Sequence, residues 1–338
     1  ISRRQKLLKL AIYFKGFLRG GFKGGKRQLQ NYNAFKAQGS VPPVMPRKER
    51  KFTKLSKDIR EYQQSYKFPK DIKFSVLVPL YNTNASHLKA MLDSVLEQTY
   101  SKWELCLCDA SDSEHDYVEK TVAEYMDYDD RIVYKRLESN GGISANTNEC
   151  KALATGDYIA MLDHDDMLAP NALFEVAKQI EQGADFIYTD EEVFERDILN
   201  PVAIHFKPDY APDSLSSINY ICHLTVIKKT LFDRIGDFDS ECDGSQDYDI
   251  ILRATEKAQK IVHIPKVLYY WRNHADSVSA DISVKPYCIT SAIKALDKRF
   301  IEGKAEKIEN IYSTVPKRTA YNYIAKSRPS QYNFFAII

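Results

Sequence analysis

An acidic segment directly follows an apolar run that predicts a buried strand. Asp163, His164, Asp165 and Asp166 come immediately after residues 158–162. Carboxylates concentrated in one loop repel each other unless a cation lies between them, and two carboxylate oxygens together with a diphosphate hold a hard divalent ion well. The segment therefore favours a metal site. The alternative is a solvated turn in which Asp166 caps the following helix.

Two reaction classes place an Asp-x-Asp motif after a buried strand. One is glycosyl transfer from a nucleotide sugar, and the other is phosphatase chemistry through an aspartyl phosphate. The phosphatase motif expects Thr or Val two residues after its second Asp and follows the first strand. Here that position is Met167 and the motif follows the fourth predicted strand, so the spacing argues against a phosphatase.

The ends of the first two predicted strands carry further polar residues. The segment 79–82 after the first strand has neither a G-x-G-x-x-G nor a G-x-x-x-x-G-K-S/T pattern, which excludes the usual dinucleotide and P-loop sites. After the second strand, Asp109 and residues 110–112 could hydrogen-bond a base or a ribose. An ordinary turn would have the same composition.

These segments belong to a regular alternation of strands and helices. Apolar runs predict strands, and periodic patterns predict the helices between them. The strands are expected at 74–79, 103–108, 132–137, 158–162 and 185–189, and the helices at 86–98, 114–127, 143–154 and 170–181. This order predicts an α/β fold with a mostly parallel sheet flanked by helices on both faces. Ligands of such sheets bind beyond the carboxyl ends of the strands.

Eight motifs in a fixed order now carry a family resemblance. They are Val78-Pro79-Leu80-Tyr81-Asn82, Ser94-Val95-Leu96-Glu97-Gln98-Thr99-Tyr100, Asp109-Ala110-Ser111, Asn140-Gly141-Gly142-Ile143-Ser144, Ala154-Thr155-Gly156-Asp157-Tyr158, Leu162-Asp163-His164-Asp165-Asp166, Gly244-Ser245-Gln246-Asp247-Tyr248-Asp249 and Tyr270-Trp271-Arg272-Asn273-His274. Residues 74–285, about 60% of the chain, resemble a family 2 glycosyltransferase of the GT-A fold. The subgroup it is most similar to builds bacterial O-antigens, capsules and rhamnose-rich polysaccharides.

The resemblance implies a donor site and a metal site. Pro79, Tyr81 and Asp109 would surround the base and ribose, and Asn148 would line the same cleft. Asp163 would contact the ribose. The metal, Mn²⁺ or Mg²⁺, would hold the diphosphate of a UDP- or dTDP-linked sugar. The implied metal ligands are Asp163, Asp165 and His274, and Arg272 would add positive charge near the donor; a surface-loop histidine is the alternative for His274.

The resemblance also implies a catalytic base and an acceptor site. Asp247 matches the base that takes the acceptor proton in an inverting transfer. Gln246 stands where the family often has Glu, so contacts with the acceptor are expected to differ there. Asp190 and Glu191, with Glu192, follow the fifth predicted strand and would face the acceptor, although a solvated acidic loop is equally compatible. His223 is also assigned to the acceptor side, and Lys207 is a weaker candidate.

The charge of the chain is unevenly distributed. The 338 residues have a net charge of +2, but residues 1–48 contain twelve Lys or Arg and no Asp or Glu. Residues 7–18 predict an amphipathic helix within this basic segment. Such a helix favours an anionic membrane surface, each charge contributing on the order of 1 kcal/mol; a helix packed on the body is the alternative. Nucleic acid is not an expected partner, because no binding motif or aromatic platform follows.

The remaining features concern compartment and organisation. The composition is that of a globular protein, and the six cysteines predict buried reduced thiols, with Cys106 and Cys108 on one face. No apolar run is long enough for a membrane span, and the N-terminal segment lacks signal-peptide features. We expect a peripheral protein on the inner face of the cytoplasmic membrane. The strand-like run 332–338 suggests that the native chain continues into another catalytic domain.

The sequence thus predicts three regions and one principal function. The regions are a basic extension and linker (1–70), a GT-A domain (71–285, with a nucleotide half to 190 and an acceptor half from 191) and a C-terminal helix and tail (286–338). The predicted function is metal-dependent inverting transfer of a sugar to a lipid-linked or polysaccharide acceptor in bacterial surface glycan synthesis. The alternative is an inactive GT-A module that binds a glycan or a partner.

Overall fold

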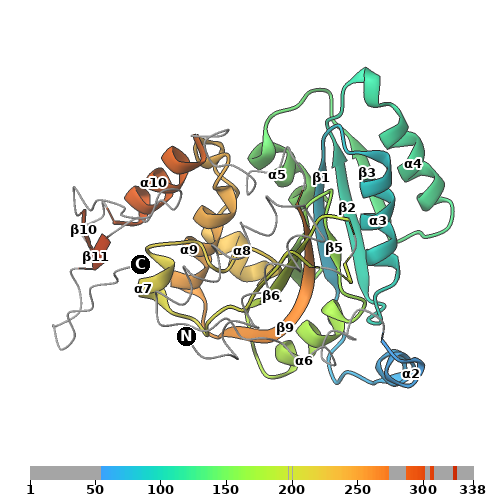
Figure 1. The fold of residues 1–338 in the computed structure, drawn as a ribbon, viewed down its shortest axis with the longest axis horizontal. Helices are drawn as coiled ribbons and strands as arrows, with labels where there is room; N and C mark the ends of the chain where they lie inside the picture. Colours follow the sequence, from blue (N-terminus) through green and yellow to red (C-terminus); the bar gives the residue numbers. More distant parts are fainter. Residues whose placement is uncertain are drawn as a thin grey trace, which may run out of the picture. The chain divides into compact units, whose positions relative to one another are not determined.

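A single mixed sheet organises most of the described chain. The computed structural model describes residues 55–196, 198–199, 201–273 and 287–300, and the short strands β10 (Ala305–Lys307) and β11 (Tyr323–Ala325). Nine strands form the sheet in the order β3-β2-β1-β4-β8-β6-β9-β5, with β7 paired to β6. Helices lie on both sides of this curled sheet, as Figure 1 shows. Strands β10 and β11 form a separate antiparallel pair.

The first half of the sheet is parallel, as predicted. Its strands are β1 (Phe74–Leu80), β2 (Trp103–Asp109), β3 (Ile132–Arg136) and β4 (Tyr158–Met161), in the order β3-β2-β1-β4. The connecting helices are α3 (Ala85–Leu96), α4 (Tyr117–Met126) and α5 (Ile143–Leu153). Every residue of β1 and β2 is buried, which explains why these strands read as apolar runs without alternation. Their carboxyl ends therefore meet at one edge of the sheet.

The second half is mixed: it adds antiparallel strands to the sheet, beside one parallel pair. It contains β5 (Met167–Leu168), β6 (Phe186–Phe194), β7 (Ala203–His205), β8 (Thr225–Lys228) and β9 (Ile261–Arg272). Strand β8 runs antiparallel to both β4 and β6, whereas β6 and β9 are parallel. The helices here are α6 (Ala172–Glu181), α7 (Pro212–Leu215), α8 (Lys229–Ile235) and α9 (Gln246–Lys257). The direction of a strand here depends on how segments that are distant in the sequence pair with each other. Local apolar patterns do not encode that pairing.

Strand β6 is longer than predicted and includes residues that were expected to form a loop. The predicted strand ended at Thr189, but β6 continues to Phe194, so Asp190, Glu191 and Glu192 are buried strand residues. This corrects their placement in a loop facing acceptor or solvent. The register between β6 and β9 shifts on both sides of Asp190. Such an irregularity redirects side chains locally.

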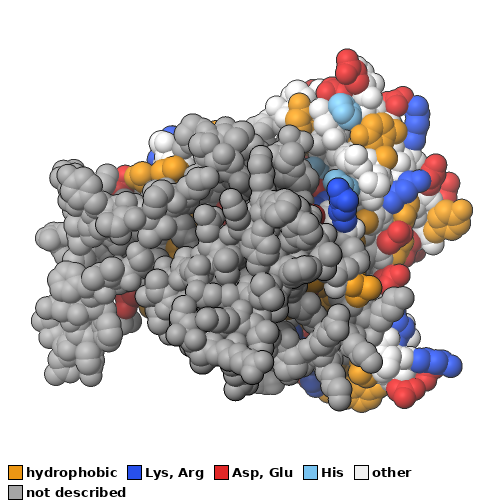
Figure 2. Space-filling view, viewed as in Figure 1, with side chains coloured by type: hydrophobic (Ala, Val, Ile, Leu, Met, Phe, Trp, Pro, Cys, Tyr) orange, Lys and Arg blue, Asp and Glu red, His pale blue; other side chains and the backbone are white. Residues whose placement is uncertain are grey.

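Two apolar cores lie on opposite faces of the sheet. One core joins the sheet to α3, α4 and α6, and the other joins it to α5, α8, α9 and α10 (Tyr287–Phe300). All six cysteines are free, five are buried, and Cys106 and Cys108 share the second core, as predicted. Figure 2 shows acidic and basic side chains intermixed over the described surface near α3 and α4.

Both ends of the described chain pack against this body. Helix α2 (Lys57–Ser65) falls within the predicted extension 1–70, yet its buried Gln63 accepts a hydrogen bond from Thr99 Oγ1 (2.9 Å). Helix α10 contacts α9 through Ser245 Oγ, which donates to the Cys288 carbonyl (2.8 Å). The division at residues 70, 190 and 285 stays a prediction. The predicted helix 7–18 and the tail 332–338 lie outside the described residues, and no described helix is long and apolar enough to cross a membrane.

Candidate active site

The loops after β1 and β2 are joined at the carboxyl edge of the sheet. Asn82 Nδ2 donates to Asp112 Oδ2 (2.8 Å), and the Asp112 backbone N–H donates back to Asn82 Oδ1 (3.0 Å). Pro79 is buried in β1, and the neighbouring Tyr81 is 45% exposed. An exposed ring at this edge is suited to stacking on a base. The donor-binding roles of Pro79 and Tyr81 stay predictions.

Asp109 ends β2 as a fully buried carboxylate with its own partners. Its Oδ2 accepts hydrogen bonds from Arg136 Nη1 (2.5 Å) and Tyr134 Oη (2.9 Å), and its Oδ1 accepts from the Ser111 backbone N–H (2.9 Å). Burial of this charge is tolerated because a guanidinium neutralises it. The sequence did not single out Arg136. Its guanidinium contacts Asp109, the predicted ligand of the nucleotide base, and also lines the neighbouring hollow.

That hollow lies at the carboxyl end of β3 and has a volume of about 360 Å³. Arg136, Gly141 and Asn146 are among the residues that line it. Gly142 has a φ of +93°, and a Cβ there would lie 2.5 Å from Asp243 Oδ2. The motif beginning at Asn140 therefore has a conformational role: its turn opens helix α5 beside the hollow.

The Asn148 side chain is hydrogen-bonded to the backbone of Phe238. Its Nδ2 donates to the Phe238 carbonyl (2.9 Å), and its Oδ1 accepts from the Phe238 backbone N–H (2.9 Å). Both ends of the amide are therefore used to hold the segment before α9. The predicted donor contact of Asn148 stays a prediction. A side chain on a helix can face either a cleft or a neighbouring loop, and the sequence does not say which.

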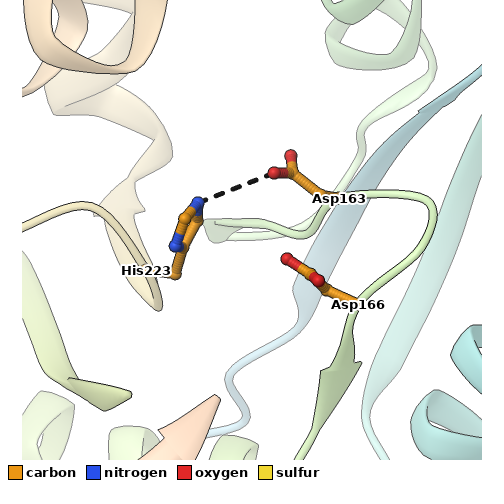
Figure 3. Close-up of side chains that lie close together, drawn as sticks. All are labelled: Asp163, Asp166 and His223. Atoms are coloured by element: carbon orange, nitrogen blue, oxygen red, sulfur yellow. Dashed lines mark ion pairs between the residues drawn. The ribbon is translucent and has the colours of Figure 1, made fainter. Parts of the chain in front are cut away.

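The acidic loop after β4 places two of its carboxylates close to one histidine. Asp163, Asp166 and His223 each offer a ligand atom within 4.8 Å of the others, and Figure 3 shows all three. Asp163 is 55% exposed and its Oδ2 lies 3.6 Å from His223 Nε2. His164 Nδ1 lies 2.9 Å from Thr83 Oγ1, which ties the loop to the end of β1.

Asp166 is the buried carboxylate of this loop. It is 1% exposed, and it accepts hydrogen bonds from Tyr269 Oη (2.7 Å) and the Arg272 backbone N–H (2.6 Å). Burial and the neighbouring charges of Asp163 and Asp165 raise the pKa of Asp166 well above its usual value. The helix-cap alternative is wrong, because β5 follows the loop and α6 begins at residue 172.

Arg272 fixes the acidic loop from β9. Its Nε donates to the Asp165 carbonyl (2.7 Å), and its guanidinium carbon lies 4.6 Å from the centre of the Phe194 ring. Burial lowers the pKa of Arg272 from its very high usual value, and an arginine side chain stays a cation in proteins. The predicted donor contact of Arg272 stays a prediction. The predicted ligand His274 lies outside the described residues.

His223 links the acidic loop to a buried charge network. Its ring stacks on Tyr269 (centroids 4.6 Å apart, 14° between planes), and its Nδ1 lies 3.3 Å from Glu191 Oε2. Burial alone would lower the pKa of His223, but contacts with Asp163 and Glu191 outweigh it and hold the pKa well above its usual value. His223 therefore faces Asp163, rather than lying only on the acceptor side.

Glu191 and Lys207 form the centre of that network. Their side chains are each 2% exposed, and Lys207 Nζ lies 2.9 Å from Glu191 Oε2, while His205 Nδ1 lies 2.7 Å from Glu191 Oε1. Burial would raise the pKa of Glu191, but the hydrogen bonds of His205 and His223 outweigh it and hold the pKa well below its usual value. Asp190 is used in the same way, since the Lys207 backbone N–H donates to its Oδ1 (2.9 Å). Both carboxylates are buried, and their acceptor-binding roles stay predictions.

Asp247 lies in the first turn of α9, within electrostatic range of the acidic loop. Burial raises its pKa above the usual value, the charge of His223 lowers it, and the charge of Asp163 raises it. Asn219 Nδ2 donates to Asp247 Oδ2 (2.8 Å). The predicted acceptor ligand Gln246 accepts from the Gly244 backbone N–H (2.9 Å) at the start of the same helix. A carboxylate with a raised pKa is well matched to proton abstraction.

The structure thus brings Asp163, His223 and Asp247 together and adds residues that the sequence did not single out. Tyr269 holds Asp166 and Asn219 holds Asp247. Tyr269 directly precedes a recognised motif, so its position beside Tyr270 was a usable signal. A single Asn between predicted elements, such as Asn219, carries no comparable signal.

The comparisons with known proteins identify the family. Residues 75–235 match the sequence model described as "Glycosyl transferase family 2". The glycosyltransferase YwdF of Bacillus subtilis, itself uncharacterized, is 30% identical over 63% of this chain and 80% of its own length. The O-antigen biosynthesis protein RfbC of Myxococcus xanthus is 31% identical over 73% of this chain, and the uncharacterized protein y4gI of Sinorhizobium fredii is 38% identical over 72%. The match spans only 19% and 27% of these last two proteins.

Solved structures show the same fold at low sequence identity. S. aureus TarS 1–349 in complex with UDP-GlcNAc has a TM-score of 0.54 and 18% identity, over 68% of this chain and 73% of that one. The mannosyltransferase PcManGT from Pyrobaculum calidifontis, in complex with GDP-Man and Mn²⁺, has a TM-score of 0.52 and 17% identity, over 73% and 71%. With the family match and the mixed sheet, these likenesses support one conclusion: the chain belongs to glycosyl transferase family 2 and has the GT-A fold.

Proposed function

We propose that the protein is a metal-dependent inverting glycosyltransferase that uses a nucleotide-diphosphate sugar. One observation carries the proposal: Asp247, a carboxylate with a raised pKa, lies within electrostatic range of the cluster of Asp163, Asp166 and His223. A base and a nearby candidate cation site are the two groups that this reaction needs.

In the proposed reaction, the acceptor hydroxyl oxygen forms a bond to the anomeric carbon of the donor sugar. Its proton passes to Asp247, and the bond between the anomeric carbon and the diphosphate oxygen breaks. The electron pair leaves with the nucleoside diphosphate, so atoms and charge balance. Burial favours the neutral form of Asp247, and the raised pKa strengthens the carboxylate as a base.

The ligand set of the acidic loop fits a divalent cation. Two carboxylates and an imidazole lie within 4.8 Å of one another, and Asp163 keeps about half of its side chain exposed to an incoming ligand. When bound, Mn²⁺ or Mg²⁺ would neutralise charge on the leaving diphosphate. Glu191 contacts the other nitrogen of His223, as carboxylates behind metal-binding histidines commonly do. Asp163, Asp166 and His223 are the proposed ligands, and Asp165 stays a predicted one.

The donor and acceptor are proposed from the relatives. TarS has been solved with UDP-GlcNAc and PcManGT with GDP-Man, which supports a nucleotide-sugar donor without selecting the base. The name of RfbC supports an acceptor in O-antigen or related polysaccharide synthesis. We propose a lipid-linked or polymeric glycan acceptor and a peripheral position on the inner face of the cytoplasmic membrane.

A donor screen followed by turnover tests the proposal. Thermal unfolding of the full chain is measured with UDP-, dTDP- and GDP-linked sugars, with and without Mn²⁺, because a bound donor raises the midpoint. The best donor is then incubated with bacterial membranes as the glycan source, and release of the nucleoside diphosphate is followed. We expect Asp247→Asn to lower kcat about 100-fold or more and Asp163→Ala to abolish the Mn²⁺-dependent thermal shift.

Asp58→Asn is a matched control, because Asp58 also occupies the first turn of a helix but is exposed on α2. It is expected to turn over at the wild-type rate. Wild-type turnover by Asp247→Asn would contradict the assigned base. No Mn²⁺-dependent shift with any of these donors would contradict the assigned reaction.

A further inference from the structure

A short segment between α7 and β8 contacts both halves of the site. We call residues 219–223 the base loop. At one end Asn219 Nδ2 donates to Asp247 Oδ2 (2.8 Å), and at the other end His223 Nε2 lies 3.6 Å from Asp163 Oδ2. The segment therefore lies between the proposed base and the proposed metal ligand.

The orientation of the Asn219 amide is fixed by the loop itself. The Cys222 backbone N–H donates to Asn219 Oδ1 (3.3 Å), so the Nδ2 group is the end that faces Asp247. Cys222 adopts a φ of +39°, in the left-handed region that residues other than glycine seldom occupy. The surrounding structure must hold this backbone in place.

The buried Lys207–Glu191 pair supplies that hold. Lys207 Nζ donates to the Ile221 carbonyl (2.5 Å) and to the His223 carbonyl, and Glu191 Oε2 accepts from the His223 backbone N–H (3.2 Å). Both side chains are almost completely buried. A buried ammonium and a buried carboxylate that each contact the same loop fix it to β6 and to the end of β7. Lys207 and Glu191, which the sequence suggested as acceptor-binding residues, thus anchor the base loop.

We infer that Asn219 is a positioning residue for Asp247, an inference that rests on the proposed function. The amide binds one carboxylate oxygen, and this bond opposes rotation of the carboxylate about its Cβ–Cγ bond. The other oxygen, Oδ1, is thereby oriented to receive the acceptor proton. The backbone N–H groups of the first turn of α9 act on the same carboxylate, so Asn219 supplies the contact from outside the helix. A base displaced by about 1 Å can lose on the order of 100-fold in rate.

The test compares kcat with the KM for the donor, using the donor and membranes from the turnover assay above. Asn219→Ala removes the amide, and Asn219→Asp keeps the size but replaces the donor group with a second carboxylate. We expect both to lower kcat about tenfold or more, with the KM for the donor within about threefold of wild type. Asn171→Ala is the matched control, because Asn171 Nδ2 also contacts a carboxylate, Glu175 Oε1 (3.3 Å), but at the start of α6.

A double variant separates positioning from folding. If Asn219 acts through Asp247, Asn219→Ala should add no further loss of kcat to the residual turnover of Asp247→Asn. Thermal midpoints of all variants, measured with the donor and Mn²⁺, show whether each is folded and still binds. Independent losses in the double variant, or an Asn219→Ala kcat within twofold of wild type while Asp247→Asn is impaired, would overturn the inference alone. Wild-type turnover by Asp247→Asn would instead overturn the proposed function.

Discussion

At the scale of single residues, Tyr269 contacts all three residues that are proposed as metal ligands. Its hydroxyl donates to Asp166 Oδ2 (2.7 Å) and accepts from the Asp163 backbone N–H (3.2 Å). Its ring also supports His223 by stacking. One side chain therefore sets the position of all three proposed ligands. The ring and the hydroxyl can be separated experimentally, because Phe keeps the first and removes the second.

We predict that Tyr269→Phe lowers the free energy of unfolding by about 1–3 kcal/mol, because the buried carboxylate of Asp166 loses a hydrogen-bond donor and the Asp163 backbone N–H loses its acceptor. Its affinity for Mn²⁺ should also fall, since Asp163 and Asp166 lose their common contact. Urea unfolding and calorimetric Mn²⁺ titration provide the two measurements. Tyr128→Phe removes a hydroxyl from a side chain that is 89% exposed and should change neither quantity. Unchanged stability and affinity in Tyr269→Phe would show that the hydroxyl is dispensable.

Asn148 and Asp190 show a limit of what the sequence can predict. The family resemblance assigned Asn148 to the donor, and the position of Asp190 after a predicted strand assigned it to the acceptor. In the folded chain Asn148 bonds to the Phe238 backbone, and Asp190 accepts from Lys207 and lies 2.9 Å from His263 Nε2. Partners that are distant in sequence decided whether each polar group is available to a ligand.

At the scale of elements, a motif that contributed to the family resemblance stabilises the edge of the sheet opposite the site. Glu104, near the start of β2, accepts hydrogen bonds from Lys73 Nζ (2.5 Å), Ser75 Oγ (2.6 Å) and the Thr155 backbone N–H (2.5 Å). The Gly156 backbone N–H also donates to it (3.1 Å). The motif beginning at Ala154 therefore joins α5 to β4 and has no contact with the candidate site through this network.

The protein should lose the stabilising contribution of Glu104 in acid. Burial alone would raise its pKa, but the hydrogen bonds from Lys73, Ser75 and Thr155 outweigh burial and lower the pKa to about 2. A folded-state pKa below the unfolded-state value means that the ionised form stabilises the fold above about pH 4.5, and that this contribution is lost as the pH falls toward 2. The difference amounts to about 3 kcal/mol.

Glu104→Gln should therefore be less stable than wild type at pH 7, and the difference should shrink between about pH 4.5 and pH 2. Urea unfolding across this range measures it. Glu97→Gln is the control, because Glu97 pairs with Arg60 at 3.8 Å on the surface, where such a pair contributes little. A constant difference between wild type and Glu104→Gln at all pH values would contradict this assignment.

The close packing around Gly156 gives a second prediction for the same turn. A Cβ at this position would lie 2.7 Å from the Lys73 carbonyl oxygen and 2.8 Å from the Ser75 backbone nitrogen, and backbone atoms cannot move aside easily. Gly156→Ala should lower the free energy of unfolding by about 1–3 kcal/mol, as overpacking does. Thermal and urea unfolding would measure the change. Equal stability of the two proteins would mean that the turn relaxes without cost.

At the scale of the whole molecule, charge is divided between the N-terminal segment and the rest of the chain. Residues 1–30 carry nine Lys or Arg and no acidic residue. We predict that the full chain floats with vesicles containing phosphatidylglycerol and that deletion of residues 1–30 removes this binding, because each basic side chain is attracted to the anionic surface. Vesicles of phosphatidylcholine alone are the control. Equal flotation after the deletion would contradict the predicted membrane contact.

Much of the fold was predictable because local apolar patterns encode buried parallel strands. Strands β1 to β4 and helices α3 to α5 lie close to their predicted positions. The rest of β6 was missed because a strand with three consecutive acidic residues reads as a loop. The charges of Asp190 and Glu191 are tolerated because His263 lies against the first, and Lys207 and His205 lie against the second, in the folded chain.

The sequence by itself determined the family resemblance, the parallel half of the sheet and the edge at which the acidic residues gather, because these follow from apolar runs and from motifs in a fixed order. Only the tertiary structure decided which of these residues meet. It placed Asp166 and His223 beside Asp163, paired Asn219 with Asp247 and joined the Asn148 amide to the Phe238 backbone. The physical reason is that a buried polar group must find a partner, and the partner's identity depends on segments that only folding brings together.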